Sequence, residues 1–373
     1  DAYTLETEEL LRKIEELVAI GGTQILMQGG MNPGLELDWY LDMLGAIKER
    51  FPSVHVHAFS PPELMEFIEF FGAEGDSLFA KARWVLSKLK AAGMDSLPGG
   101  GGEIFAAPVR RKIGLGKCDH EAWLTIMYAA HSLGMFTSAS MMFGHIEGYA
   151  DRIDHMRCVR TWQDKAMGVD AESERREGSD IFGHYKAFIA WPFQRDNSPL
   201  GRVKDWGSQA GDTGDFPGDV VATLSGDGDA KAHPEFGRRL RTSGTVDYLR
   251  TQALSRLFLD NIYSIGASWV TMGPQVGQTA LAFGANDMGS VMMEENVVSA
   301  AGTTYCIDEP VLCRLIREAG FMPAQRNNTY DILRVHEGAE SPDRAVRDWS
   351  AHRTKRLHIE QRSEAPLTIG TTD

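Results

Sequence analysis

Short apolar segments alternate with longer amphipathic segments along most of the chain. The longer segments repeat apolar residues at helical spacing, and the first of them has Thr4 or Thr7 as its cap and ends at Gly21-Gly22. We expect helices at residues 5–20, 37–51, 76–92, 120–133, 149–167, 246–261 and 275–283. We expect strands at residues 23–27, 55–60, 95–98, 137–143, 186–193, 267–271 and 286–290.

This alternation predicts an α/β fold, because strands separated by helices pair in parallel through right-handed crossovers. The pattern contains seven strands, whereas a parallel β/α barrel of the TIM type has eight. We therefore expect that the first barrel strand lies upstream of Asp1, a residue that is also not a methionine. A doubly wound open sheet is the alternative fold.

Two segments interrupt the alternation and set the expected domain organisation. Residues 168–183 are charged and polar, and residues 201–244 are rich in Gly and Asp, so both are read as polar insertions. Residues 1–335 then form one barrel domain. Residues 336–373 are charged and lack a core pattern, which suggests a C-terminal tail or the arm of a homodimer.

Composition narrows the class of function. The chain is 43% hydrophobic and carries a formal net charge of −14, which disfavours nucleic acid and anionic membrane surfaces as partners. Its apolar runs are far shorter than the roughly 20 residues that span a bilayer. The four cysteines show no CxxC spacing, which indicates a reducing, cytoplasmic location without a disulfide framework.

Polar and glycine-rich motifs follow the expected strands, where a parallel barrel places its chemistry. These motifs are QGGMNP at 28–33, HVHAFSPPE at 55–63, SLPGGGGE at 96–103, SASMMFGHIE at 138–147, AWPFQ at 190–194 and GANDMGS at 284–290. Glycines in the first and third motifs allow a ligand to approach bare backbone. Neither motif matches a phosphate-binding or dinucleotide-binding loop.

A metal-dependent hydrolase is the main alternative function. His55 and His57 lie on the same face of one strand, which is a spacing used by metal ligands. Asp287 could complete such a site, but the middle strands offer only His145 as a further ligand. A polar contact from His57 to a bound ligand is the reading that we prefer.

Taken together, the motifs resemble the radical S-adenosylmethionine enzymes of the futalosine route to menaquinone. The matching segments are ILMQGG, HVHAFSPPE, DSLPGGGGEIF, MMFGHIE, FIAWPFQ, ASWV, FGANDMGS and MMEENVVSAAG. The resemblance extends from Asp1 to about Leu333 and is strongest to the cyclase branch. Aminofutalosine synthase and the deazaflavin-cofactor synthase share parts of this pattern and remain alternatives.

The resemblance implies two cofactors, S-adenosylmethionine and a 4Fe-4S cluster, and an external electron donor. The family binds its cluster through CxxxCxxC, and this sequence contains no such motif and hence no metal ligands of that kind. We expect the ligand cysteines upstream of Asp1; a paralogue that lost the cluster and only binds ligands is the alternative. The implied reaction begins with a deoxyadenosyl radical that removes a hydrogen atom from the ribose of dehypoxanthinyl futalosine. The sugar radical then adds to the aromatic ring of this small nucleoside-derived substrate, and loss of an electron and a proton gives the spirocyclic product.

The resemblance also assigns roles to individual residues. The residues expected to bind S-adenosylmethionine are Gln28, Gly29, Gly30, Ser60, Glu103 and Ser140. The residues expected to bind the substrate are His57, Trp191 and Asn286. Asp287, His145 and Glu294 are the candidates for catalysis, because a carboxylate or an imidazole could remove the final proton.

Overall fold

The structure is a computed structural model that describes residues 4–29, 32–113, 118–169, 182–194, 198, 243–293, 302–338 and 341–353. Its centre is a six-stranded sheet in the order β1-β2-β3-β4-β5-β6, in which every neighbouring pair is parallel. The strands are β1 (Gln24–Met27), β2 (His55–Ala58), β3 (Ser96–Leu97), β4 (Phe136–Phe143), β5 (Tyr185–Pro192) and β6 (Ser264–Gly266). The parallel α/β sheet that the sequence predicts is thereby confirmed.

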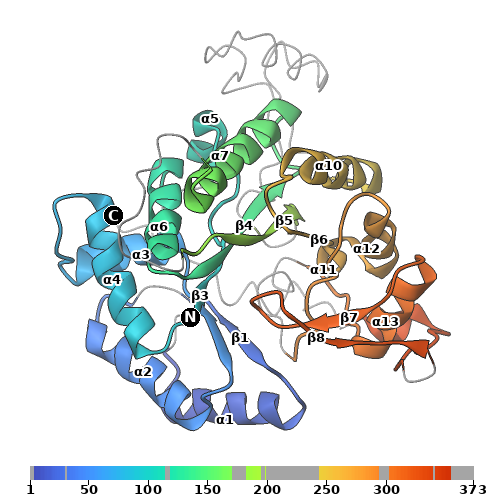
Figure 1. Cartoon of the computed structure of the whole chain (residues 1–373), viewed down its shortest axis with the longest axis horizontal. Helices are drawn as coiled ribbons and strands as arrows, with labels where there is room; N and C mark the ends of the chain where they lie inside the picture. Colours follow the sequence, from blue (N-terminus) through green and yellow to red (C-terminus); the bar gives the residue numbers. More distant parts are fainter. Residues whose placement is uncertain are drawn as a thin grey trace.

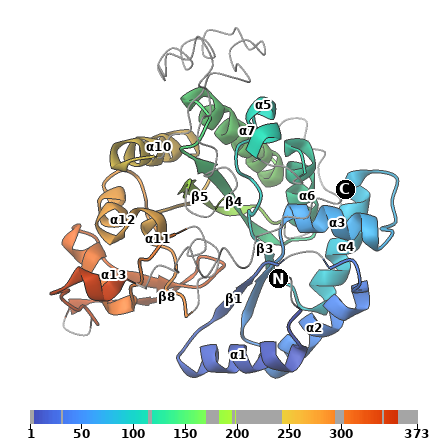
Figure 2. The same ribbon diagram turned by 180° about the vertical axis from the view of Figure 1, so that it is seen from behind.

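Helices cover the outer face of this curved sheet (Figure 1). The longer ones are α1 (Thr7–Ala19), α2 (Leu37–Arg50), α3 (Pro61–Phe70), α4 (Leu78–Ala92), α6 (His120–Ser132), α7 (Tyr149–Met167), α10 (Thr245–Phe258) and α13 (Glu309–Glu318). Shorter helices are α5 (Ala107–Ile113), α11 (Trp269–Met272), α12 (Pro274–Leu281) and the 3-10 helix η2 (Trp349–His352). The view from behind shows α7, α6, α4 and α2 following one another around the same side (Figure 2).

The last part of the sheet differs from the sequence-based expectation. The strand expected at residues 267–271 is wrong: β6 ends at Gly266, and Trp269 begins the short helix α11. The strand expected at 286–290 is reduced to one parallel bridge between Gly266 and Asp287. The reason is that Ala267-Ser268 turns the chain, with the Ser268 amide donating to the Tyr248 hydroxyl at 2.7 Å.

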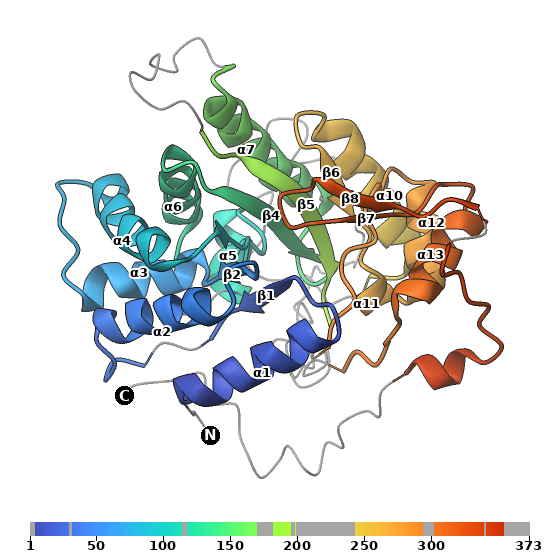
Figure 3. The same cartoon turned by 60° about the horizontal axis from the view of Figure 1, so that its bottom comes forward.

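One side-chain hydrogen bond joins the two ends of the sheet. The Gln24 side chain at the start of β1 donates to the Ser290 hydroxyl at 3.4 Å, and Ser290 follows the bridge to β6. The sheet is therefore bent toward closure, as in a barrel. An antiparallel hairpin, β7 (Ala324–Arg326) with β8 (Ile332–Val335), lies beside this junction (Figure 3).

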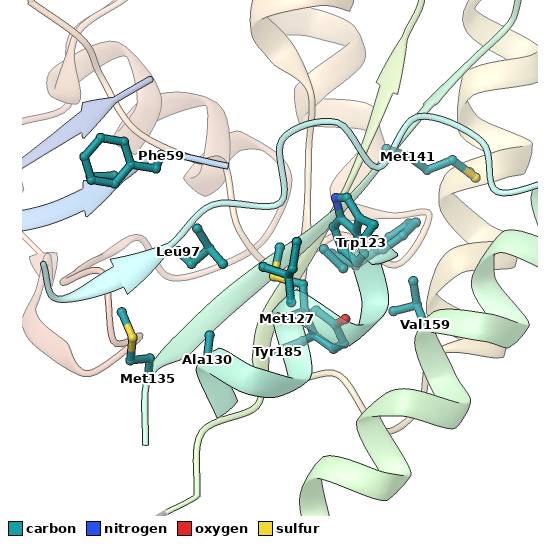
Figure 4. Close-up of a cluster of buried hydrophobic side chains, with 14 of the residues drawn as sticks. Phe59, Leu97, Trp123, Met127, Ala130, Met135, Met141, Val159 and Tyr185 are labelled. Atoms are coloured by element: carbon teal, nitrogen blue, oxygen red, sulfur yellow. The ribbon is translucent and has the colours of Figure 1, made fainter. Parts of the chain in front are cut away.

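The core lies between the sheet and the helices that cover it. Apolar side chains of β3, β4 and β5 pack against α6 and α7, as the labelled residues Leu97, Met141, Trp123 and Val159 illustrate (Figure 4). Tyr185 stacks on Trp123 with ring centroids 6.3 Å apart. This packing holds the strands in place and so determines where the loops after them begin.

Two further features complete the description of the fold. Within the described residues, no helix is long and apolar enough to cross a membrane. Part of the expected tail is packed rather than extended: His336 is buried, Asp343 pairs with Arg317 of α13, and Tyr305 forms a bridge with Arg353.

Candidate cofactor and substrate site

The turn after β1 and the start of α3 meet at one buried carboxyl group, that of Glu63. The Gly29 amide donates to Glu63 Oε1 at 3.1 Å, and the Ser60 hydroxyl donates to Oε2 at 2.5 Å. Ser60-Pro61-Pro62-Glu63 has the spacing of a capping box, in which the hydroxyl would cap the helix. Here the Ser60 hydroxyl leaves that role and binds the carboxyl group instead. The motif thus links two strand ends.

Burial changes the protonation of this carboxyl group. Glu63 is 8% exposed, and desolvation raises its pKa to about 7 despite the hydrogen bonds from Ser60 and Gly29. Among the described residues, no positively charged side chain contributes to this pKa. A buried carboxylate without a cation is costly, so the group is suited to receive the charge of a bound cationic ligand.

The glycine run after β3 is held from three sides. The Arg110 guanidinium donates to the carbonyls of Gly101 and Gly102 at 2.9 and 2.7 Å, and the Trp123 indole donates to the Gly100 carbonyl at 2.9 Å. A Cβ atom on Gly102 would lie 2.5 Å from the Ser140 carbonyl oxygen. The run must therefore be glycine to pack on β4, and its conformation is set before any ligand binds.

Gln28 and Ser140 connect this glycine run to its neighbours. A Cβ atom on Gly100 would meet the Gln28 amide at 2.3 Å, and that amide donates to the Phe59 carbonyl at 3.3 Å. The Ser140 hydroxyl donates to the Gly99 carbonyl. The turns after β1, β2 and β3 are thus joined to Ser140 within β4, which brings five of the six expected cofactor residues to one edge of the sheet. The sixth, Gly30, lies outside the described residues.

Glu103 ends the glycine run in a strained conformation. Its φ angle is 46°, which a residue other than glycine adopts only when its surroundings enforce it. The Glu103 carbonyl accepts the amide of Met142 on β4 at 3.1 Å. The strained backbone therefore sets the direction of the Glu103 side chain at the end of β3, the place where the sequence predicts a ribose contact.

A second polar group lies on β2 and β3. The His55 and His57 rings contact the Ser96 hydroxyl at 2.7 and 2.6 Å, and Asn328 of the hairpin turn reaches the same hydroxyl at 3.4 Å. Burial, together with the charge of Arg326, lowers the pKa of His57 to about 3, so its ring is neutral. Among the described residues, no third His, Cys, Asp or Glu joins the two rings within ligand distance. The rival metal-site reading therefore gains no support.

The candidates for proton removal are placed in different surroundings. Asp287 is held by the Arg326 guanidinium through two contacts, Nε to Oδ2 at 2.6 Å and Nη2 to Oδ1 at 3.0 Å. The His145 side chain is fully buried, and its Nδ1 lies 3.0 Å from Glu147. Glu294 lies outside the described residues. Of the two that are described, Asp287 pairs with Arg326, whose charge also acts on His57. His145 lies inside a turn.

The other expected substrate residues also differ in their accessibility. The side-chain oxygen Oδ1 of Asn286 accepts from the Ile265 amide at 2.9 Å and from Arg256 at 2.7 Å, which gives it a role in the turn after β6. Trp191 lies near the end of β5, opposite Met142 of β4, and is partly exposed. Trp191 can therefore offer its ring to a ligand, whereas Asn286 is occupied.

Two residue groups were missed by the sequence-based reasoning. Glu63 has the capping-box spacing, which normally explains such a residue without a ligand, so only the fold reveals its contact with Gly29. Arg326 and Asn328 come from a hairpin for which the apolar pattern gave no signal. Within this chain, a mixed run such as AQRNNTYDILRV is short and largely polar.

The residues described here differ in how they fit the expected cofactors. The Gly29–Glu63 contact and the preset glycine run fit a ligand with an ammonium group and a ribose, as S-adenosylmethionine has. The four cysteines Cys118, Cys158, Cys306 and Cys313 do not fit a 4Fe-4S cluster of this family, because their spacing in the sequence is not that of CxxxCxxC.

The sequence is similar to known protein families and to individual enzymes. Residues 1–159 match the profile of the radical SAM superfamily, and residues 235–339 match the CofH/MqnC C-terminal region. The cyclic dehypoxanthine futalosine synthase of Halalkalibacterium halodurans is 39% identical over 92% of this chain and 77% of its own length. The aminodeoxyfutalosine synthase of Thermus thermophilus is 33% identical over 91% and 77%. The 5-amino-6-(D-ribitylamino)uracil–L-tyrosine 4-hydroxyphenyl transferase of Methanopyrus kandleri is 32% identical over 90% and 77%.

Proposed function

Because the chain belongs to the radical SAM superfamily, in the family that shares the CofH/MqnC C-terminal region, we propose that it is a cyclic dehypoxanthine futalosine synthase. Such an enzyme closes a new ring in dehypoxanthine futalosine during menaquinone biosynthesis. A second relative of the same name, from Streptomyces coelicolor, is 32% identical over 90% of this chain. The higher identity of the first such relative favours this activity over those of the two sister enzymes.

The single observation that carries the proposal at the site is the buried Glu63 carboxyl group beside Gly29. The ammonium group of an amino acid bound at the end of β1 would be held by the Glu63 carboxylate and by backbone groups of the Gln28-Gly29 turn. S-adenosylmethionine, when bound, supplies the hydrogen-abstracting chemistry of the superfamily. Glu63 would fix the amino acid end of this cofactor, and Glu103 and Ser140 would face its ribose.

Preorganisation is the contribution of the glycine run. Arg110 and Trp123 hold its carbonyls before a ligand arrives, so binding does not have to order the loop. A fixed loop also keeps the two reactants at a constant separation, which matters because a misplaced reactant loses rate steeply. We therefore assign Arg110 a positioning role rather than a contact with either ligand.

We assign substrate binding to the polar side chains of His55, His57 and Ser96 on β2 and β3. His57, neutral at physiological pH, offers a ring nitrogen without the cost of burying a charge. Trp191 at the end of β5 would cover an aromatic or nucleoside ring of the substrate. Asp287, which pairs with Arg326 through two contacts, remains the candidate base of the three proposed.

The test is to identify the product. Protein expressed anaerobically from its native gene, with measured iron and sulfide, is incubated with S-adenosylmethionine, a reductant and each family substrate in turn. We expect dehypoxanthine futalosine to give a product that is lighter by two hydrogen atoms, with deoxyadenosine formed in step. Formation of aminodeoxyfutalosine, or transfer from tyrosine to a ribitylaminouracil, would reassign the chain to a sister activity.

A further inference from the structure

Three side chains of the metal-binding types meet away from the site described above. Glu309 and Cys313 lie four residues apart on α13 and so share one face of this helix. His336 follows β8 directly, and one donor atom from each of the three lies within 4.8 Å of the others. The closest pair is His336 Nε2 and Glu309 Oε1, at 3.0 Å. Figure 1 shows α13 beside the β7–β8 hairpin.

The backbone holds this group together. The His336 amide donates to the Pro323 carbonyl at 3.0 Å, and the Arg317 guanidinium donates to the His336 carbonyl at 2.7 Å. Arg317 also pairs with Asp343 at 2.7 Å, so its positive charge is balanced beside the three side chains. The relative positions of α13 and His336 are therefore set by contacts that do not involve the three donor atoms.

One atom in the group lacks a partner. The His336 side chain is 2% exposed, and its Nδ1 makes no hydrogen bond within the described residues. Leaving a buried polar atom unpaired costs about 1–3 kcal/mol. The Cys313 side chain is also buried, beside the carboxylate of Glu309 on the same helix face. A buried imidazole, a buried thiol and a carboxylate thus lie together with their polar atoms only partly satisfied.

We propose that Glu309, Cys313 and His336 bind one divalent transition-metal ion, with Zn²⁺ as the ion that fits best. A set of one sulfur, one nitrogen and one oxygen donor suits zinc, whereas Mg²⁺ and Ca²⁺ require oxygen donors. Binding would replace the thiol proton by the metal and would give the imidazole a partner. Three protein ligands leave one position of a tetrahedral ion for water.

The location gives the metal a structural consequence. The ion would join α13 to the base of the hairpin, and the turn of this hairpin carries Arg326 and Asn328 to Asp287 and Ser96. A metal bond at the base would limit the movement of these two side chains. This inference does not depend on the proposed reaction, because the three ligands lie outside the strand ends.

The experiment uses cobalt as a spectroscopic substitute for zinc. The protein is stripped with a chelator and titrated with Co²⁺ while the near-ultraviolet and visible spectrum is recorded. We expect one equivalent to produce a thiolate-to-cobalt charge-transfer band that zinc displaces. Cys313→Ser should abolish the band, and Cys306→Ser, which removes an exposed thiol in the preceding segment, should leave it unchanged. No band in the unaltered protein, or a band that survives Cys313→Ser, would overturn the proposal.

A second variant covers the case in which Cys313→Ser fails to fold. Glu309 is 47% exposed in its side chain, so Glu309→Gln should preserve the fold. We expect it to weaken cobalt binding by at least about tenfold, since the loss of even an outer-shell partner has an effect of that size. Added zinc should raise the unfolding temperature of the unaltered protein and not that of Glu309→Gln. Equal affinity and equal zinc stabilisation in the two proteins would exclude Glu309 and the site as proposed.

Discussion

Glu63 illustrates how the environment of a single residue decides its chemistry. A carboxyl group at this position of an exposed helix would remain ionised and would stabilise the helix start through the dipole. Burial beside the Gly29 turn instead raises its pKa to about 7, so that a proton or a ligand cation must supply the missing charge. Ser60 and Gly29 lower the cost without removing it. The ionised form of this residue therefore destabilises the fold, and a cationic ligand, as proposed above, would offset that cost.

Glu63→Gln tests both sides of this argument. Because the folded pKa is raised above the unfolded value, the ionisable side chain costs stability as pH rises from about 4.5 toward 7. We expect Glu63→Gln to raise the free energy of unfolding at pH 8 by about 2–3 kcal/mol and to have little effect at pH 5. The measurement is urea unfolding at the two pH values. A loss of stability at pH 8 would contradict the raised pKa.

The same variant should bind S-adenosylmethionine less well, because a charged hydrogen bond is lost. We expect the affinity to fall by about 10- to 100-fold at pH 8. In the unaltered protein the affinity should decline as pH falls below about 7, and this decline should disappear in Glu63→Gln. Calorimetric titration of the anaerobic protein checks both. Glu66→Gln, which replaces another carboxylate on α3, is the matched control.

At this scale, sequence patterns identify residue types but not their partners. The glycine run and Gln28 follow strands, Ser140 lies within one, and the family resemblance assigns Gln28 and Ser140 to the cofactor; the structure places them together. His145 and Asn286 also follow strands, but local turns occupy their polar atoms. A turn and a binding site use the same polar residues. The sequence therefore predicts where the strands end, and the packing of each loop decides which side chains remain available.

The elements after β4 are joined by a buried ion network. Arg152 of α7 contacts Glu147 at 2.8 Å and Asp247 of α10 at 2.9 Å, and its side chain is 1% exposed. Glu147 in turn accepts the amides of Gly144 and His145 at 2.6 and 2.9 Å. Opposite charges hold the pKa of Glu147 well below its usual range. One guanidinium thus connects the turn after β4 to two helices.

Removing this guanidinium should be costly. Arg152→Met leaves Glu147 and Asp247 without the guanidinium that bridges them, and we expect it to lower the free energy of unfolding by about 3–5 kcal/mol. Arg157→Ala on the same helix is the control, because its pair with Asp154 is exposed and worth less than about 1 kcal/mol. Chemical denaturation of both variants measures the change in the free energy of unfolding. Comparable losses of stability in the two variants would mean that burial of the network adds nothing to the free energy of unfolding.

The elements themselves were easier to predict where the apolar period is long. Helix α7 has the predicted bounds, because an extended helical pattern is stopped by Gly168 in a left-handed conformation. The region after β6 was misread, since an apolar run such as ASWV suits a strand or a buried helix equally. The β7–β8 hairpin escaped prediction because its strands are exposed. Short elements carry too little pattern to separate these cases.

Across the whole molecule, several titratable groups are buried where the sheet meets the helices. His155 of α7 is completely buried and stacks on Phe105 with ring centroids 3.9 Å apart. Neither ring nitrogen has a hydrogen-bond partner within the described residues. Burial, with the Arg110 charge nearby, lowers its pKa to about 3. The same Arg110 holds the glycine run, so a charge on His155 would act on the core and on the site together.

His155→Phe therefore tests how acid unfolds the whole molecule. The folded pKa is depressed below the ordinary value of 6.5, so the unfolded chain binds a proton that the folded protein cannot. The stability that depends on the neutral ring is full above about pH 6.5 and declines as pH falls toward 3. A phenyl ring keeps the stacking on Phe105 and carries no proton. We expect the variant to lose less stability than the unaltered protein between pH 7 and pH 5, by about 1–2 kcal/mol. Met156→Leu, equally buried and without a titrating group, should keep the original dependence, and an unchanged slope in His155→Phe would show that acid acts elsewhere.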